Sequence, residues 1–116
     1  ITENVSDKNP AAIDGETPLH VAAEKGNFKI CKLIIENVQS KNPVGIDDNT
    51  PLHLAAGKGY LKIYKLIIKS SIQIHPPIQL AAIENSRNNL GQTPLDVAAL
   101  NGYPKICKYI DSIVEK

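Results

Sequence analysis

Residues 17–35 read TPLHVAAEKGNFKICKLII, and nearly the same stretch returns as TPLHLAAGKGYLKIYKLII at residues 50–68. A third, altered copy, TPLDVAALNGYPKICKYI, occupies residues 93–110. The first two copies begin 33 residues apart. Self-similarity at such a period is typical of a solenoid, in which each unit buries its apolar face only against its neighbours. We therefore expect a stack of repeats whose function lies on the surface that the repeats share.

Each copy carries the signals of two short helices. It begins with a threonine and a proline, which favour a helix start as N-cap and as first helical residue. Nine residues after the threonine stands a glycine, which accepts the left-handed conformation that ends a helix. In the first copy Ile30, Leu33 and Ile34 then follow the spacing of an apolar helix face. We predict a helical hairpin in each copy.

These residues resemble the ankyrin repeat, in which a β-turn finger, two antiparallel helices and a loop make one layer. The resemblance covers nearly the whole chain and implies an all-α solenoid of stacked helix-turn-helix units with β-turn fingers. It also implies that the histidine after Thr-Pro-Leu ties its own finger to the neighbouring finger by hydrogen bonds. The residues that carry the resemblance are Thr17, Pro18, Leu19, His20, Ala22, Ala23 and Gly26, then Thr50, Pro51, Leu52, His53, Ala55, Ala56 and Gly59, and finally Thr93, Pro94, Leu95, Ala98, Ala99 and Gly102.

The repeat register divides a single ankyrin-repeat domain, residues 1–116, into parts. Because residues 3–14 match residues 36–47, we expect the chain to begin inside a longer array. The predicted parts are the end of a preceding repeat at 1–12, repeats at 13–45 and 46–75, an insertion or degenerate repeat at 76–88, and a C-terminal capping repeat at 89–116.

The insertion arises because the second and third copies begin 43 residues apart. Its sequence PPIQLAA, at residues 76–82, can be laid on TPLHLAA. This match indicates a shortened repeat that retains only a first helix. The alternative is an extended loop with one helical turn. We favour an insertion that bears a helix.

Three other residues depart from the family pattern. Val38 and Lys41 stand where the family usually has a glycine and a buried valine, which leaves the geometry of that loop open. Asp111 stands in the third copy where Ile35 and Ile68 stand in the others. An unpaired carboxylate is costly to bury, so Asp111 should face water, as a capping repeat requires.

Composition indicates one monomeric domain with an aliphatic core, since 42% of the 116 residues are hydrophobic but only four are Tyr and one is Phe. No apolar run approaches the ~20 residues needed to span a membrane. Cys31 and Cys107 occupy the same repeat position. Stacked helices lie roughly 8 to 10 Å apart, so these two cysteines should exceed the ~7 Å Cα limit for a disulfide. We expect reduced cysteines and an intracellular protein, cytoplasmic or nuclear.

Candidate catalytic or metal-binding residues are few. His20 and His53 lack the short spacing of a zinc motif such as H-E-x-x-H, and the two cysteines form no C-x-x-C pair. No glycine-rich phosphate loop, nucleophile elbow or paired-carboxylate site is recognisable. We expect no cofactor, no bound metal and no catalysis, and we assign both histidines a structural role.

Charge is segregated although the net charge is only +1. Stacking should build two lysine ladders on the outer face of the second helices, from Lys29, Lys62 and Lys105 and from Lys32, Lys65 and Lys108. The ladders are interpreted as a solvated helix face, with an anionic polymer or membrane surface as the alternative ligand. Nucleic acid is disfavoured, because aromatic side chains for base stacking are missing.

The acidic residues instead fall on the fingers and on the end of the first helices, the concave side in ankyrin-like modules. Loops on a rigid scaffold are where binding residues concentrate, so we predict that a protein partner binds there. Ile13 and Ile46 are either apolar anchors for it or side chains that stabilise the stack. The alternative function is a regulatory or targeting domain of a larger enzyme. The predicted contact residues are Ile13, Asp14, Glu16, Glu24, Lys25, Ile46, Asp47, Asn49, Lys58, Asn89, Leu90, Gln92, Leu100 and Asn101.

Overall fold

The structure, a computed structural model, describes residues 16–38, 41, 43–72 and 76–114. These residues form helices and turns and contain no strand, which confirms the predicted all-α class. The elements are α1 (Pro18–Lys25), α2 (Phe28–Asn37), the short 3₁₀ helix η1 (Ile46–Asp48), α3 (Pro51–Lys58), α4 (Leu61–Ser71), α5 (Pro76–Glu84), α6 (Pro94–Leu100) and α7 (Pro104–Val114).

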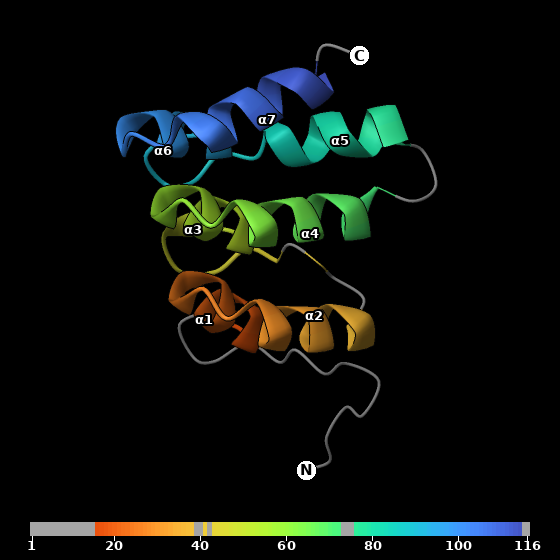
Figure 1. The fold of residues 1–116 in the computed structure, drawn as a ribbon. Helices are drawn as coiled ribbons and strands as arrows, with labels where there is room; N and C mark the ends of the chain where they lie inside the picture. The colour runs from red at the N-terminus through yellow and green to blue at the C-terminus, as the bar shows by residue number, and fades with distance from the viewer. Residues whose placement is uncertain (1–15, 39–40, 42, 73–75, 115–116) are drawn as a thin grey trace.

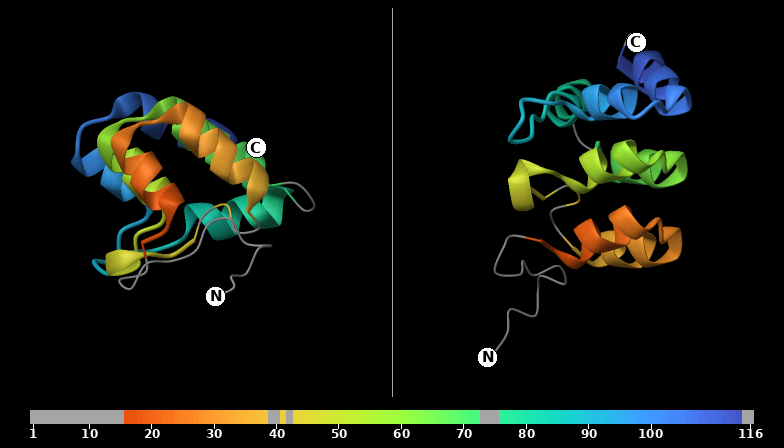
Figure 2. Two further views of the ribbon diagram at one scale, coloured as in Figure 1. Left: turned by 90° about the horizontal axis from the view of Figure 1, so that it is seen from below. Right: turned by 90° about the vertical axis from the view of Figure 1, so that its left-hand side faces the viewer.

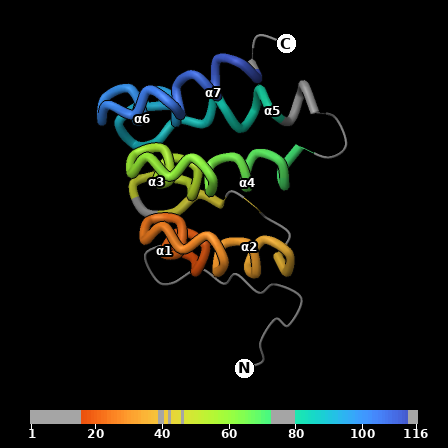
Figure 3. Tube along the Cα trace, viewed as in Figure 1, coloured from red at the N-terminus to blue at the C-terminus, as the bar shows by residue number. Residues whose placement is uncertain are grey.

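The helices form hairpins that stack in layers. α1 pairs with α2, α3 with α4, and α6 with α7 (Figure 1). The first helices of the layers pack in the order α1, α3, α6, which the Cα trace shows as one column (Figure 3). The loops between layers project from one side of the stack (Figure 2, right). This is the predicted solenoid, with its fingers in a row.

The first helix of each layer begins as the sequence predicts. The hydroxyl groups of Thr17, Thr50 and Thr93 accept a hydrogen bond from the backbone N–H three residues later. The side chain at that third position, a histidine in α1 and α3, accepts from the threonine N–H in return. Such a reciprocal pair satisfies two backbone donors that a helix start otherwise leaves free.

One apolar repeat position is exposed in the first layer and buried in the other two. Ile30, Ile63 and Ile106 share one repeat position, but Ile30 is 42% exposed whereas Ile63 and Ile106 are 2% and 1% exposed. The preceding layer therefore covers this position in the second and third layers. In the third layer, Asp111 is exposed, as expected for this residue, and the capping role of the layer stays a prediction.

Lys41 replaces the missing C-terminal glycine of α2. Its ammonium group donates a hydrogen bond to the Ile35 carbonyl over 2.7 Å, and it also donates to the Val38 carbonyl. Val38 itself is extended, with φ −121° and ψ 158°. The last carbonyls of a helix need partners, and a lysine near the C-terminus can supply them.

The insertion between the second and third copies contains α5, a helix of nine residues. The helix is longer than the single turn expected if the insertion were an extended loop. α5 lies at the level of α6 and α7 and packs against α4 (Figure 1). The division of the chain into repeats around it stays a prediction.

A buried carboxyl group joins α5 to α4. Glu84, at the end of α5, is only 7% exposed. Its Oε1 accepts a 2.7 Å hydrogen bond from the Tyr64 hydroxyl, while its Oε2 has no hydrogen-bond partner. The Tyr109 ring meets the Tyr64 ring edge-on at 6.2 Å. Burial raises the pKa of the Glu84 carboxyl, and the Tyr64 hydrogen bond opposes this only in part.

The glycines that end α1 and α3 also make room for the next layer. Gly59 has φ 75°, and a Cβ placed on it would lie 2.5 Å from the Tyr103 ring. A Cβ on Gly26 would meet the Tyr60 ring at 2.7 Å. Glycine is therefore needed here both for its left-handed backbone and for the close approach of an aromatic ring.

We expect Gly59→Ala to destabilise the fold more than Gly102→Ala. Both glycines have positive φ, but no atom lies within 4 Å of a Cβ on Gly102, so the control carries only the backbone strain. Overpacking should add about 1–3 kcal/mol to the loss at Gly59. Urea unfolding of both variants measures the difference. Equal losses of unfolding free energy would show that the Tyr103 ring can move away without cost.

Glu84→Gln should stabilise the protein at neutral pH. A raised carboxyl pKa means that the folded state holds a proton that the unfolded chain releases above about pH 4.3. Stability should therefore fall as pH rises through the folded pKa in the wild type, and this fall should be absent in the variant. Urea unfolding of both proteins between pH 4 and pH 8 measures it. A constant difference across that range would contradict a buried, titrating Glu84.

Candidate functional site

The second finger, residues 45–49, and the third finger, residues 88–92, have the same hydrogen-bonded framework. In each, the first residue's N–H donates to the carbonyl of the fifth, from Gly45 to Asn49 over 2.8 Å and from Asn88 to Gln92 over 2.9 Å. In each, the fourth residue has positive φ, 60° at Asp48 and 76° at Gly91. Aspartate and glycine tolerate this conformation, so both sequences can form the same tight finger.

Buried histidines hold neighbouring fingers together. The Nδ1 of His53 accepts from the Thr50 N–H over 3.2 Å, so its Nε2 carries the proton and donates to the Gln92 carbonyl at 2.8 Å. His20 makes the equivalent bond to the Asn49 carbonyl at 2.9 Å. These bonds confirm the structural role expected for both histidines. Burial lowers the pKa of His53, which favours the neutral ring that this arrangement requires.

Asn88 is a further link between the fingers that the sequence did not reveal. Its Nδ2 donates to the side-chain oxygens of Asn49, at 3.0 Å, and Gln92, at 2.9 Å. In addition, the Asn89 N–H donates to the Asp47 carbonyl at 2.8 Å. In the sequence, the only sign of this role was that asparagine favours the start of a tight turn. The hydrogen bond from Asn88 to the other finger is a tertiary contact and could not be predicted.

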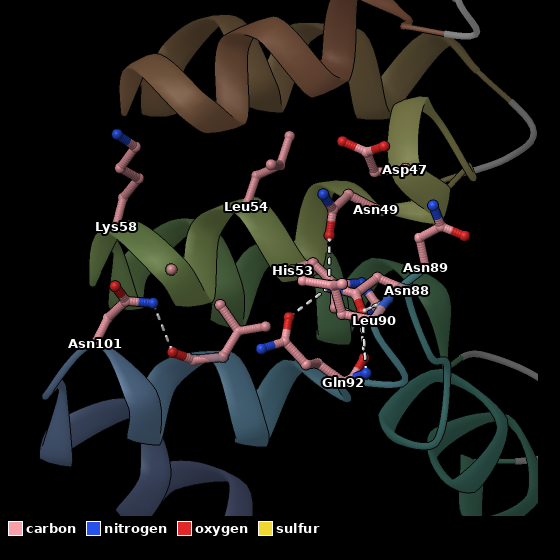
Figure 4. A pocket seen from close by; sticks show the side chains of 12 residues that line it. Asp47, Asn49, His53, Leu54, Lys58, Asn88, Asn89, Leu90, Gln92 and Asn101 are labelled. Carbon is pink, nitrogen blue, oxygen red and sulfur yellow. Dashed lines mark hydrogen bonds between the residues drawn. The ribbon is translucent and has the colours of Figure 1, made fainter.

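A groove with a volume of about 470 Å³ lies between these fingers and the first helices α3 and α6 (Figure 4). It brings together part of the predicted contact set, from two layers of the stack. The predicted residues that line it are Asp47, Asn49, Lys58, Asn89, Leu90, Gln92 and Asn101. The sequence did not single out its other lining residues, which are His53, Leu54, Gly57, Asn88 and Val97.

The groove has an acidic end and a basic end. Asp47 lies at the finger end beside Asn89, while Lys58 lies at the opposite end beside Asn101 (Figure 4). Leu54 lies between them. Asp47 and Lys58 are both exposed. The groove thus offers opposite charges at its two ends, with amide and aliphatic side chains along it.

The other predicted contact residues do not line this groove. Glu16, Glu24 and Lys25 belong to the first layer, and Leu100 is 73% exposed outside it. Ile13 and Asp14 lie outside the described residues, as does the side chain of Ile46. Whether the two isoleucines anchor a partner or stabilise the stack stays a prediction.

The outer face carries most of the predicted lysine ladders in exposed positions. Lys29, Lys62 and Lys105 are all exposed. Lys65 is half-buried, and its ammonium group lies 5.2 Å from the centre of the Tyr109 ring. This is the range of a cation–π contact, so one ladder position already interacts within the protein.

The described residues contain neither a cluster of metal ligands nor a membrane-spanning helix. Nowhere in that part of the chain do three or more His, Cys, Asp or Glu side chains gather as potential metal ligands. Nor does any helix there have the length and apolar character needed to cross a membrane. Cys31 is fully buried, which raises the pKa of its thiol to about 11, so it packs as a small apolar side chain.

We expect His53→Ala to be more destabilising than Asp96→Ala by about 1–3 kcal/mol, the penalty for an unsatisfied buried group. Asp96 is the matched control, because it makes the same capping contacts with Thr93 at the exposed end of the stack. The stability of the wild type should also depend on pH. Because the His53 pKa is lowered in the fold, the free energy of unfolding should fall as pH drops below about 6.5.

Urea unfolding from pH 5 to pH 8 should show a weaker dependence of stability on pH for His53→Ala than for the wild type. The same dependence in both proteins would contradict the role of His53.

Comparison with known proteins agrees with this architecture. A family model described as ankyrin repeats (3 copies) matches residues 1–78. No curated protein matches the chain. Ankyrin repeats are generally protein–protein interaction modules. With a family match over more than half of its length and the histidine-linked fingers that the structure describes, the chain belongs to the ankyrin repeat family.

Proposed function

We propose that this chain is a non-catalytic interaction module and that it binds a protein partner in the groove between the second and third fingers. The single observation that supports this proposal is the convergence of Asp47, Lys58, Leu90 and Asn101 on one cavity (Figure 4). These residues come from two fingers and from two first helices. A surface assembled in this way depends on the stack, as expected for an interaction module.

The fingers are well suited to bind without rearrangement. The His53–Gln92 and Asn89–Asp47 hydrogen bonds fix one finger on the other. A preformed site loses less conformational entropy when a partner binds. Leu90 is 80% exposed at the tip of the third finger, where it offers apolar surface to a partner. We infer rigid docking with little change in shape.

The proposal is tested by affinity capture from cell lysate with three forms of the chain. The groove variant carries Asp47→Lys and Leu90→Ser, and the outer-face variant carries Lys29→Glu, Lys62→Glu and Lys105→Glu. All five side chains are exposed. Asp47 has φ 57°, which lysine tolerates less well than aspartate, so thermal melting of all three forms precedes the capture. We expect a specific protein to be captured by the wild type and the outer-face variant and to be reduced at least several-fold with the groove variant.

The opposite pattern would overturn the proposal. A ligand that only the outer-face variant loses would place the site on the lysine ladders. If that binding also fell steeply with added salt, the ligand would be an anionic polymer or membrane surface. A captured enzyme subunit that depends on the groove would instead identify the chain as a regulatory or targeting module of that enzyme.

A further inference from the structure

We propose that the groove binds an extended segment of the partner that has a basic residue, an aliphatic residue and an acidic residue in that spatial order from finger end to helix end. The basic and acidic residues should be about four or five positions apart. This inference rests on the proposed function, because it specifies the chemistry of the partner at the same groove.

The charges at the two ends of the groove set the direction of the segment. Asp47 lies at the finger end (Figure 4), and the next residue, Asp48, is also exposed. Lys58 lies at the helix end. In the described part of the chain, no opposite charge pairs with Asp47 or Lys58. The finger end therefore favours a cation, and the helix end favours an anion.

Among the described residues, no positive side chain lines the finger end. Lys41, the nearest in sequence to Asp47, donates to the Ile35 and Val38 carbonyls. Arg87, next to the third finger, donates from its Nη1 to the Gly91 carbonyl at 2.8 Å. The charge of Asp47 is therefore available to a ligand.

The length of α3 sets the spacing of the charges. α3 has eight residues, which corresponds to about 12 Å at 1.5 Å per residue. Asp47 lies four positions before the first residue of α3, and Lys58 is the last residue, so we take the length of α3 as the approximate separation of the two charges. An extended segment advances about 3.3 Å per residue, so four or five residues span such a separation. This length exceeds the Debye length of about 8 Å at physiological salt, so each charge should act on its own end of the segment.

The middle of the groove is suited to an aliphatic side chain. Leu54 and Val97 line it, and Leu90 adds apolar surface from the third finger. Gly57 also lines it, and a Cβ on that residue would lie 3.0 Å from Val97 Cγ1. Glycine is a poor residue inside a helix, but here the missing side chain lets Val97 approach α3 closely.

The amide side chains favour an extended ligand over a helical one. The side-chain oxygens of Asn49 and Gln92 each accept from Asn88. The side-chain N–H groups of Asn49 and Gln92 have no hydrogen-bond partner in the part of the chain that the structure describes. These donors can bind backbone carbonyls of an extended segment. A helical ligand would offer few, because its carbonyls already accept within the helix.

The test selects random eight-residue peptides displayed on phage against the full chain. The best peptide is synthesised with its native charges and with its basic and acidic residues exchanged. Both peptides are titrated against the wild type and against the double variant Asp47→Lys, Lys58→Glu. We expect the wild type to bind the native peptide about tenfold more tightly and the double variant to bind the exchanged peptide more tightly. The reason is that a mismatched peptide places like charges against residues 47 and 58, so that attraction becomes repulsion at both ends of the groove.

A matched control keeps the same net charge. Glu36→Lys with Lys62→Glu exchanges two exposed charges away from the groove and should leave both titrations unchanged. If the double variant shows no reversal while Leu90→Ser weakens binding, the inferred charge order is wrong and the proposed function stands.

If Leu90→Ser changes nothing, the selected peptides bind elsewhere, and the proposed groove function is contradicted as well. Recovery of no groove-dependent peptide would also overturn the inference on charge order. It would leave the lysate capture as the test of the proposed function.

Discussion

The hydrogen bond from a buried histidine to the carbonyl of the next finger is the contact on which the rest of the structure depends. His53 is 1% exposed, and both of its ring nitrogens have partners. A buried imidazole that lost either partner would leave polar groups unsatisfied. The bond therefore sets the position of one layer on the next. The Asn89–Asp47 bond and the groove both depend on that position.

The third layer carries Asp96 where the other two layers carry this histidine. Asp96 keeps the capping contacts with Thr93, but its short side chain is exposed at the end of the stack. Asp111 is exposed in the same layer. At the opposite end, Val21 and Ile30 are 45% and 42% exposed. The first layer thus leaves apolar surface at Val21 and Ile30, while the third layer exposes Asp96 and Asp111 as well as Leu100, which is 73% exposed.

The groove uses the positions that stacking leaves free to vary. Thr50, Leu52 and His53 are buried and fixed by the fold, whereas Asp47, Lys58 and Leu90 are exposed. A scaffold of this kind separates stability from specificity. The residues that hold the layers together recur from copy to copy, whereas Leu90 in the third finger stands where Asp47 stands in the second.

The sequence by itself determined the all-α class, the start of each first helix at its Thr-Pro pair, and the structural role of the histidines. The helix starts depend on hydrogen bonds between residues three positions apart. The all-α class follows from the repeat pattern, and the role of the histidines follows from the resemblance to the ankyrin repeat. The same alignment also placed several of the groove residues on one side of the stack.

Only the tertiary structure decided which of these residues meet. Asn88 reaches Asn49 across 39 positions, and Glu84 reaches Tyr64 across 20. No periodicity predicts such pairs, because they depend on how deeply one helix or finger packs against another. The burial of Glu84 and the opposed charges of the groove both follow from that packing.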